Sequence, residues 1–231
     1  MQFVSRSGGP DAARAAERAR RMNPPENEIP CAAALSAVLA RTDDVAVGLD
    51  GATVFSTGVL LRIIVRRRRD GEPDRPEDLV ALAHGGHLPP ADGRQLMLGV
   101  ELADGRRAAM LGDPWFRHLS EDDSLDVALV SRGAGGGGRT YDASYWLTVV
   151  PPAGDLRIVC AWPAFGIPET VTVLDAGPLA EAAACVVELW LVEPASADEY
   201  EPRPPARPVV APGGWFEQVL GAPTSDPGPA V

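Results

Sequence analysis

Lysine is absent from this chain of 231 residues, and all 21 of its basic residues are arginines. The absence excludes chemistries that need a lysine amine: the phosphate-loop lysine, a Schiff base, a Ser-x-x-Lys nucleophile pair and the lysine of protein kinases. Arginine, alanine, glycine and proline are all abundant, and all four are favoured by GC-rich codons. Base composition therefore explains the bias more simply than function does.

Cysteine is scarce, and long apolar runs are missing. Cys31, Cys160 and Cys185 are odd in number and show no C-x-x-C spacing, which predicts buried, reduced thiols in a cytoplasmic protein. No uncharged apolar run approaches the roughly 18 residues of a membrane-spanning helix, and residues 1–22 lack the apolar core of a signal peptide. We therefore expect no membrane partner and no standard route of secretion.

Acidic residues outnumber basic ones by 32 to 21, which gives a net charge of −11. Nucleic acid and anionic membranes are polyanions that bind basic faces, so we expect neither as a main partner. The charge is unevenly placed: the first 21 residues carry five arginines against two acids, whereas residues 193–231 carry two arginines against six acids. This layout favours binding over catalysis.

Three regions differ in composition. Residues 1–28 are expected to form a flexible basic arm, which a run of prolines separates from the rest. Residues 29–192 hold most of the apolar residues and form the predicted folded domain. Residues 193–231 contain nine prolines and four glycines and predict a disordered acidic tail, interrupted by a short amphipathic segment at 215–220.

The middle region alternates apolar and polar residues with a period of two, which is typical of antiparallel β structure. Residues 59–65 are apolar on both faces but for one arginine, so they predict a central strand. Asp-Gly pairs at 50–51 and 104–105 predict tight turns, because both residue types tolerate positive φ. Further strands are predicted at 35–39, 45–49, 96–102, 107–111, 127–131, 145–150, 156–162 and 171–173, with hairpins joining 96–102 to 107–111 and 145–150 to 156–162.

One segment changes its period. Leu179, Ala182 and Val186 recur at helical spacing, which predicts an amphipathic helix over about residues 177–190, although the adjacent Val186 and Val187 leave a strand open there. Short strands separated by turns, with one late helix, predict an antiparallel β-sandwich of immunoglobulin-like kind. A small β-barrel is the alternative.

Several stretches of the chain carry a resemblance to a known family. They are GGGGRTY at 135–141, YWL at 145–147, PPAG at 151–154, VCAWPAFGIPET at 159–170 and VELW at 187–190. Over about residues 29–192 the chain resembles a family of β-rich proteins from GC-rich actinobacteria that has no assigned activity. The resemblance implies a β-rich fold and implies no catalytic residue.

The glycine run at 133–138 is a candidate anion site, because bare backbone N–H groups can surround an anion. Its candidate residues are Gly136, Gly137 and Arg139. Phosphate cradles normally open a helix and add Lys-Ser/Thr, whereas a strand pattern follows here. A flexible hairpin loop is therefore the leading interpretation.

The nearest approach to a metal site is His84 and His87, with His118 further along. Zinc or nickel needs three or four converging ligands, and the glycines between this pair give no rigid support, so a solvated loop is the leading interpretation. Four carboxylates within residues 121–126 lack the spacing of a calcium loop. There is no G-x-S-x-G motif, and no cofactor is expected.

Aromatic residues supply the remaining candidates. Residues 162–168 predict a rigid apolar loop, either a lid over the end of the sandwich or a platform for a partner. Tyr145 and Trp146 point to opposite faces of one strand, so if one lies in the core the other is exposed or covered by another element. Segment 215–220 suits docking in a groove. The candidate partner-binding residues are Trp162, Phe165, Ile167, Trp215, Phe216 and Leu220.

Four consecutive arginines at 66–69 close the predicted central strand, and an acidic stretch follows them directly. A balanced, solvated hairpin end is the leading interpretation, and the alternative is an exposed basic edge that holds an acidic partner or deters edge pairing. Altogether the sequence predicts a cytoplasmic, non-enzymatic interaction module that acts on a protein partner through its aromatic loop and tail peptide. The alternative is an enzyme or ligand-binding protein whose site is assembled from distant histidine and acidic residues.

Overall fold

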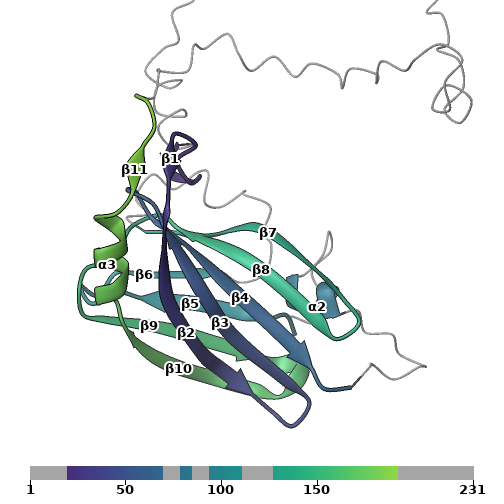
Figure 1. Ribbon diagram of the computed structural model, residues 1–231. Helices are drawn as coiled ribbons and strands as arrows, with labels where there is room; N and C mark the ends of the chain where they lie inside the picture. The colour runs from purple at the N-terminus through teal and green to yellow at the C-terminus, as the bar shows by residue number, and fades with distance from the viewer. Residues whose placement is uncertain (1–19, 70–78, 85–93, 111–126, 192–231) are drawn as a thin grey trace, which may run out of the picture. The chain divides into compact units, whose positions relative to one another are not determined.

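A computed structural model describes residues 20–69, 79–84, 94–110 and 127–191. Within these ranges two antiparallel sheets face each other, and a short ribbon stands at one end of them (Figure 1). Most of the predicted basic arm and the whole acidic tail lie outside the described residues. No described helix is long and apolar enough to cross a membrane.

The described elements follow one another in this order: β1 (Glu28–Ile29), β2 (Cys31–Arg41), β3 (Val45–Val54), β4 (Val59–Arg67), α2 (Leu79–His84), β5 (Met97–Glu101), β6 (Arg107–Met110), β7 (Leu129–Gly137), β8 (Thr140–Leu147), β9 (Asp155–Trp162), η1 (Pro163–Phe165), β10 (Ile167–Asp175), α3 (Gly177–Ala183) and β11 (Val187–Glu188). The larger sheet has the strand order β2-β3-β4-β8-β7, the smaller one has the order β10-β9-β5-β6, and β1 pairs with β11. The predicted antiparallel β-sandwich is confirmed. No sheet of described strands closes into a barrel, and the immunoglobulin-like assignment stays a prediction.

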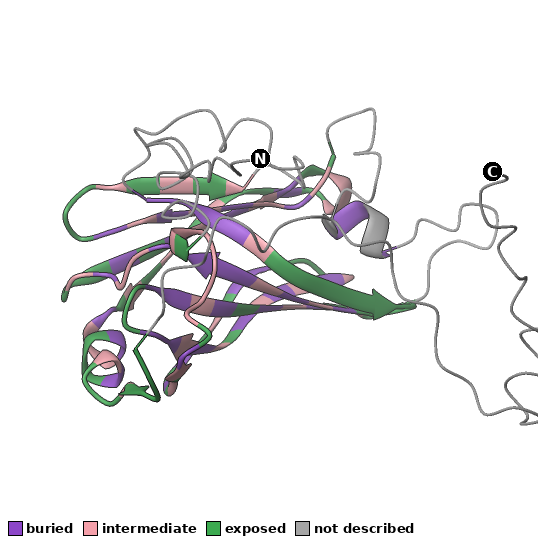
Figure 2. Ribbon diagram, turned by 90° about the horizontal axis from the view of Figure 1, so that it is seen from above, coloured by how far each residue is buried: buried purple, intermediate pink, exposed green. Residues whose placement is uncertain are grey.

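The core lies between the two sheets, where the purple inner faces meet in Figure 2. Val47 and Val65 from the larger sheet and Leu156 from the smaller one have no exposed surface. The alternation read from the sequence therefore places one face of each strand inward. As predicted, β4 is a central strand, since it lies between β3 and β8 and half-buries Leu60 and Ile64 on its outer face.

The two Asp-Gly pairs have different outcomes. The turn at 104–105 is confirmed: it joins β5 to β6, and the Asp104 carboxylate accepts hydrogen bonds from Arg106, which lower the pKa of Asp104. The turn predicted at 50–51 is wrong, because β3 continues through it. Gly51, at φ +111°, lies instead where the pairing of β3 with both neighbours shifts register. A residue with positive φ can occupy a β-bulge as well as a turn.

The hairpin predicted from 145–150 to 156–162 is wrong. Strand β8 pairs with β4 and β7 in the larger sheet, whereas β9 pairs with β5 and β10 in the smaller one. The connection therefore crosses between the layers. Pro151 and Pro152 have no N–H to donate across a tight hairpin, and Pro151 is buried in the crossing.

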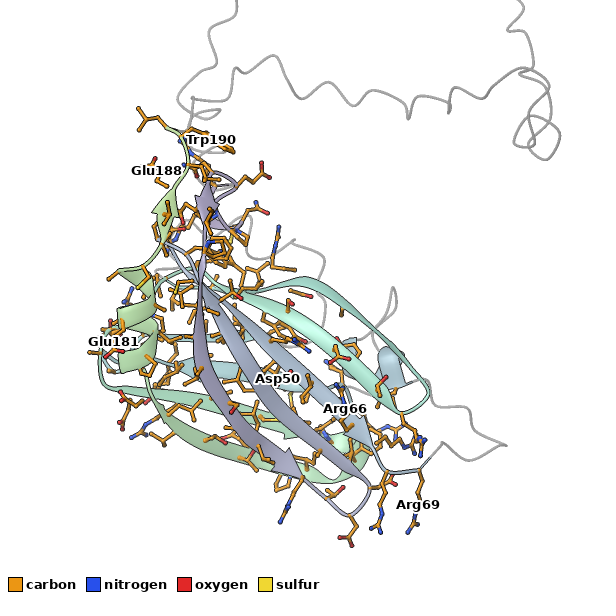
Figure 3. All side chains as sticks on the ribbon, viewed as in Figure 1. Asp50, Arg66, Arg69, Glu181, Glu188 and Trp190 are labelled. Carbon is orange, nitrogen blue, oxygen red and sulfur yellow. The ribbon has the colours of Figure 1, made fainter. Side chains whose placement is uncertain are left out.

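The late helix is shorter than predicted. Helix α3 ends at Ala183, and Val187 pairs instead with Ile29 of β1, so the strand left open at this place is present. Only Leu179 and Ala182 of the helix are buried. The chain beyond it leaves the sandwich as a ribbon, and Trp190, which a longer helix would have packed, is 61% exposed (Figure 3).

A second, smaller apolar cluster covers the outer face of the larger sheet. Trp146 points away from the core that holds Tyr145, and it packs against Phe55, with ring centroids 5.6 Å apart. Its Nε1 donates a hydrogen bond of 2.9 Å to the carbonyl oxygen of Arg21, and Met22 packs on the same cluster. The end of the basic arm, at Arg21 and Met22, thus covers Trp146 on the outer face of the sheet.

Gly58 allows the chain to pass this cluster. A Cβ at position 58 would lie 2.3 Å from the carbonyl oxygen of Leu147 and 2.6 Å from Cζ2 of Trp146. Gly58→Ala should therefore lower the free energy of unfolding by about 1–3 kcal/mol, the usual cost of overpacking, as measured by urea denaturation. Gly99→Ala is the matched control, because its Cβ would find its nearest neighbour at an ordinary 3.5 Å. Equal losses in the two variants would contradict the argument.

Candidate interaction site

The aromatic loop lies inside the structure. Trp162 has no exposed surface and Ile167 is buried, whereas Phe165 is partly exposed. The rings of Trp162 and Phe165 meet edge to face, with centroids 4.5 Å apart. Gly166 adopts the left-handed conformation, at φ +65°, and reverses the chain from η1 into β10. The loop thus closes the core, and Trp162 and Ile167 present no surface to a partner.

The glycine run is part of a strand. Gly133–Gly137 belong to β7, with Gly136 opposite Tyr141 and Gly137 opposite Thr140, so the predicted flexible loop shrinks to a turn at Gly138 and Arg139. Successive N–H groups of an extended strand point to opposite edges, whereas an anion cradle needs them to converge. Of the three candidate anion-binding residues, only Arg139 projects from the turn.

The histidine candidates are only partly covered by the structure. His84 is the last residue of helix α2, so it does not lie in a loop as predicted. His87, His118 and residues 121–126 lie outside the described residues, as do Trp215, Phe216 and Leu220. Among the residues that the structure does describe, no group of three or more His, Cys, Asp or Glu side chains could hold a metal ion.

All three cysteines are free thiols, but they differ in environment. Cys160 has no exposed surface, and burial raises the pKa of its thiol to about 11, so it stays protonated at neutral pH. Cys31 is half-buried, and Cys185 is exposed just after helix α3. The prediction of buried thiols is confirmed for Cys160 and wrong for Cys185.

Arginines gather at the end of the sandwich opposite the ribbon, where Figure 3 labels Arg66 and Arg69. The end of β2 supplies Arg41, the end of β4 and the residues after it supply Arg66–Arg69, and the turn between β7 and β8 supplies Arg139. We call these six residues the arginine-rich end. Backbone hydrogen bonds join the three segments: the N–H of Arg67 donates to the Arg139 carbonyl over 2.8 Å, and that of Arg68 to the Asp44 carbonyl over 2.7 Å.

Two arginines of this end are held in ion pairs. Arg66 lies 2.9 Å from the carboxylate of Asp142, and Arg67 lies 3.3 Å from that of Asp44. The Arg67 side chain is only 12% exposed, and its guanidinium lies 5.2 Å from the centre of the Phe165 ring. These two arginines therefore contribute contacts within the protein as well as positive charge at this end.

Three further arginines of this end are exposed to solvent. Arg41, Arg68 and Arg69 are exposed, and no salt bridge joins them to a carboxylate within the described ranges. Among the described residues of these segments the acids are Asp43, Asp44 and Asp142, against six arginines. Within the described residues, the local charge is therefore opposite in sign to the net charge of −11.

A wide hollow of about 560 Å³ opens between the turn after β2 and the end of β4. Arg41, Thr42, Asp43 and Arg68 line it. Thr42 shapes the turn, since its Oγ1 accepts hydrogen bonds from the N–H groups of Asp44 and Val45. The hollow is open to solvent, so a ligand can lie along it without having to enter an enclosed cavity.

The sequence singled out residues 66–69 and Arg139 separately, and Arg41 not at all. Nothing in the spacing of these arginines along the sequence indicates that their segments meet. The pairing of β4 with both β3 and β8 brings the segments together. The arrangement is decided by sheet order, which the sequence left open.

Comparisons of this chain with protein-family models, with curated proteins and with solved structures found no match.

The two cysteines of contrasting burial allow a direct test of the core. At mildly basic pH, iodoacetamide should modify Cys185 in the folded protein and should reach Cys160 only after denaturation, because the thiolate is the reactive form and burial keeps Cys160 protonated. Mass spectrometry of the alkylated peptides measures both sites. Modification of Cys160 at the rate of Cys185 under native conditions would show that β9 is not buried as described.

Proposed function

We propose that the protein is a non-enzymatic binding module whose arginine-rich end holds an acidic polypeptide segment of a partner protein. The observation that carries this proposal is the convergence of six arginines from three turns, three of them exposed and unpaired with described carboxylates. A concentration of like charge in an acidic chain is costly unless something of opposite charge is bound there.

The chemistry of the side chain supports a carboxylate ligand. A guanidinium presents a rigid fork of donors that matches a carboxylate with two parallel hydrogen bonds, and it stays charged at every physiological pH. Arg41 and Arg68 both line the hollow, so carboxylates of one bound segment can pair with both. The acidic body around the site repels any anion that extends beyond the arginine-rich end, so binding favours a short acidic segment.

The form of the site favours a polypeptide over a small ion or nucleic acid. Small-ligand sites are usually concave and enclose most of the ligand, whereas this hollow is broad and open. Nucleic acid would bring its phosphates close to a body of net charge −11, which opposes binding outside the arginine-rich end. The predicted contact through tail segment 215–220 stays a separate expectation, outside the described residues.

The triple variant Arg41→Gln/Arg68→Gln/Arg69→Gln tests the proposal. It should bind a fluorescent poly-glutamate peptide about three- to a hundredfold more weakly than the unaltered chain, since three exposed ion pairs contribute roughly 0.2–1 kcal/mol each and 1.4 kcal/mol is tenfold in affinity. Fluorescence anisotropy measures the affinity. Binding by the unaltered chain should also weaken as ionic strength rises, because salt screens exposed charges.

The matched control removes the same charge elsewhere. Arg62, Arg107 and Arg157 pair with Asp50 or Glu101 away from the arginine-rich end, so their triple change to Gln alters net charge equally. Equal loss in both variants would mean that net charge alone drives binding and would overturn the proposed site. Tighter binding of a DNA or RNA oligonucleotide than of the acidic peptide would overturn the choice of partner.

A further inference from the structure

Arg67 differs from the other arginines of the arginine-rich end, because its side chain is nearly buried. Only 12% of it is exposed, against 45% for the neighbouring Arg66. A guanidinium so covered has little surface for a ligand. Its partners belong to the protein itself, and they come from both sheets of the sandwich.

On one side, Arg67 holds the turn that forms the hollow. Its Nε donates to Oδ2 of Asp44 over 3.3 Å, and the N–H of the next residue, Arg68, donates to the backbone carbonyl of Asp44 over 2.7 Å. Asp44 therefore ties the turn after β2 to the end of β4 twice. Arg41 precedes this turn, Arg68 follows Arg67 directly, and both line the hollow, so these two bonds hold together the segments that carry them.

On the other side, Arg67 rests on the smaller sheet. Its guanidinium lies 5.2 Å from the centre of the Phe165 ring, a cation–π distance, and Phe165 packs against the fully buried Trp162. Phe165 ends the η1 turn between β9 and β10. One side chain thus links the aromatic loop of one sheet to the hollow on the other.

We infer that Arg67 is a positioning residue: held between Asp44 and Phe165, it sets the spacing of Arg41 and Arg68 without touching the ligand. The inference rests on the proposed function and deepens it. The aromatic loop then also contributes to binding, because Phe165 supports Arg67. An uncharged residue, Phe165, then influences an interaction between charges that it does not contact.

The experiment compares affinity and its salt dependence for the poly-glutamate peptide in full-length variants. Arg67→Met, which keeps an aliphatic stem but loses the cation, should weaken binding roughly three- to tenfold, in the range of coupled neighbouring side chains. The slope of log affinity against log salt should stay that of the unaltered chain, because no ligand contact is removed. Arg68→Gln, which does remove a contact, should reduce both affinity and slope.

Phe165→Leu provides a second variant that leaves every charge in place. It should weaken binding with an unchanged salt slope, and combined with Arg67→Met it should cost less than the sum of the two single effects, because both act through one contact. Arg67→Lys should restore part of the affinity, as a cation remains between Asp44 and the ring. Circular dichroism checks that each variant is folded. If Arg67→Met does not fold, Phe165→Leu still tests the inference.

Two results would overturn the inference. A salt slope that falls as far for Arg67→Met as for Arg68→Gln would mean that Arg67 touches the ligand. Unchanged affinity in both Arg67→Met and Phe165→Leu would mean that neither sets the spacing. If the Arg41/Arg68/Arg69 triple variant loses binding while these two do not, the proposed function stands and only the positioning role fails.

Discussion

The structure depends above all on keeping the inner faces of two antiparallel sheets away from water. Burial of each large aliphatic or aromatic side chain contributes about 1.5–3 kcal/mol, and side chains such as Val47, Val65 and Leu156 retain no exposed surface. Because side chains alternate along a strand, burying one face of a strand commits the other face to solvent or to a second cover. Both consequences are present here, and both bear on the charged surface.

The second cover lies over Trp146. Phe55 and the end of the basic arm enclose its large apolar ring, and its indole N–H donates to the Arg21 carbonyl. At the far end of the sandwich, Trp162 and Phe165 close the gap between the sheets. The aromatic residues therefore close the core where the sheets alone leave it open, and this use accounts for their positions in the sequence.

Closing the core at that end also creates the charged surface. The strands stop where the apolar interior stops, so the turns carry the polar residues, and Arg41, Arg68 and Arg139 come within reach of one another only there. Arg67 belongs to both regions, since its guanidinium covers Phe165 while its Nε pairs with Asp44. An exposed surface ion pair is weak, but one with a nearly buried arginine is screened less by salt and has fewer alternative geometries.

The sequence by itself determined the class of the fold, because alternation and Asp-Gly turns are local signals: the central position of β4 and the turn at Gly105 follow from neighbouring residues. It could not determine which strands pair across long separations, so it placed β8 and β9 in one hairpin and Gly51 in a turn. The tertiary structure decided the candidate site for the same reason. Arg41, Arg68 and Arg139 are separated in the chain, and the pairing of β4 with the preceding β3 and with the distant β8 brings their segments together.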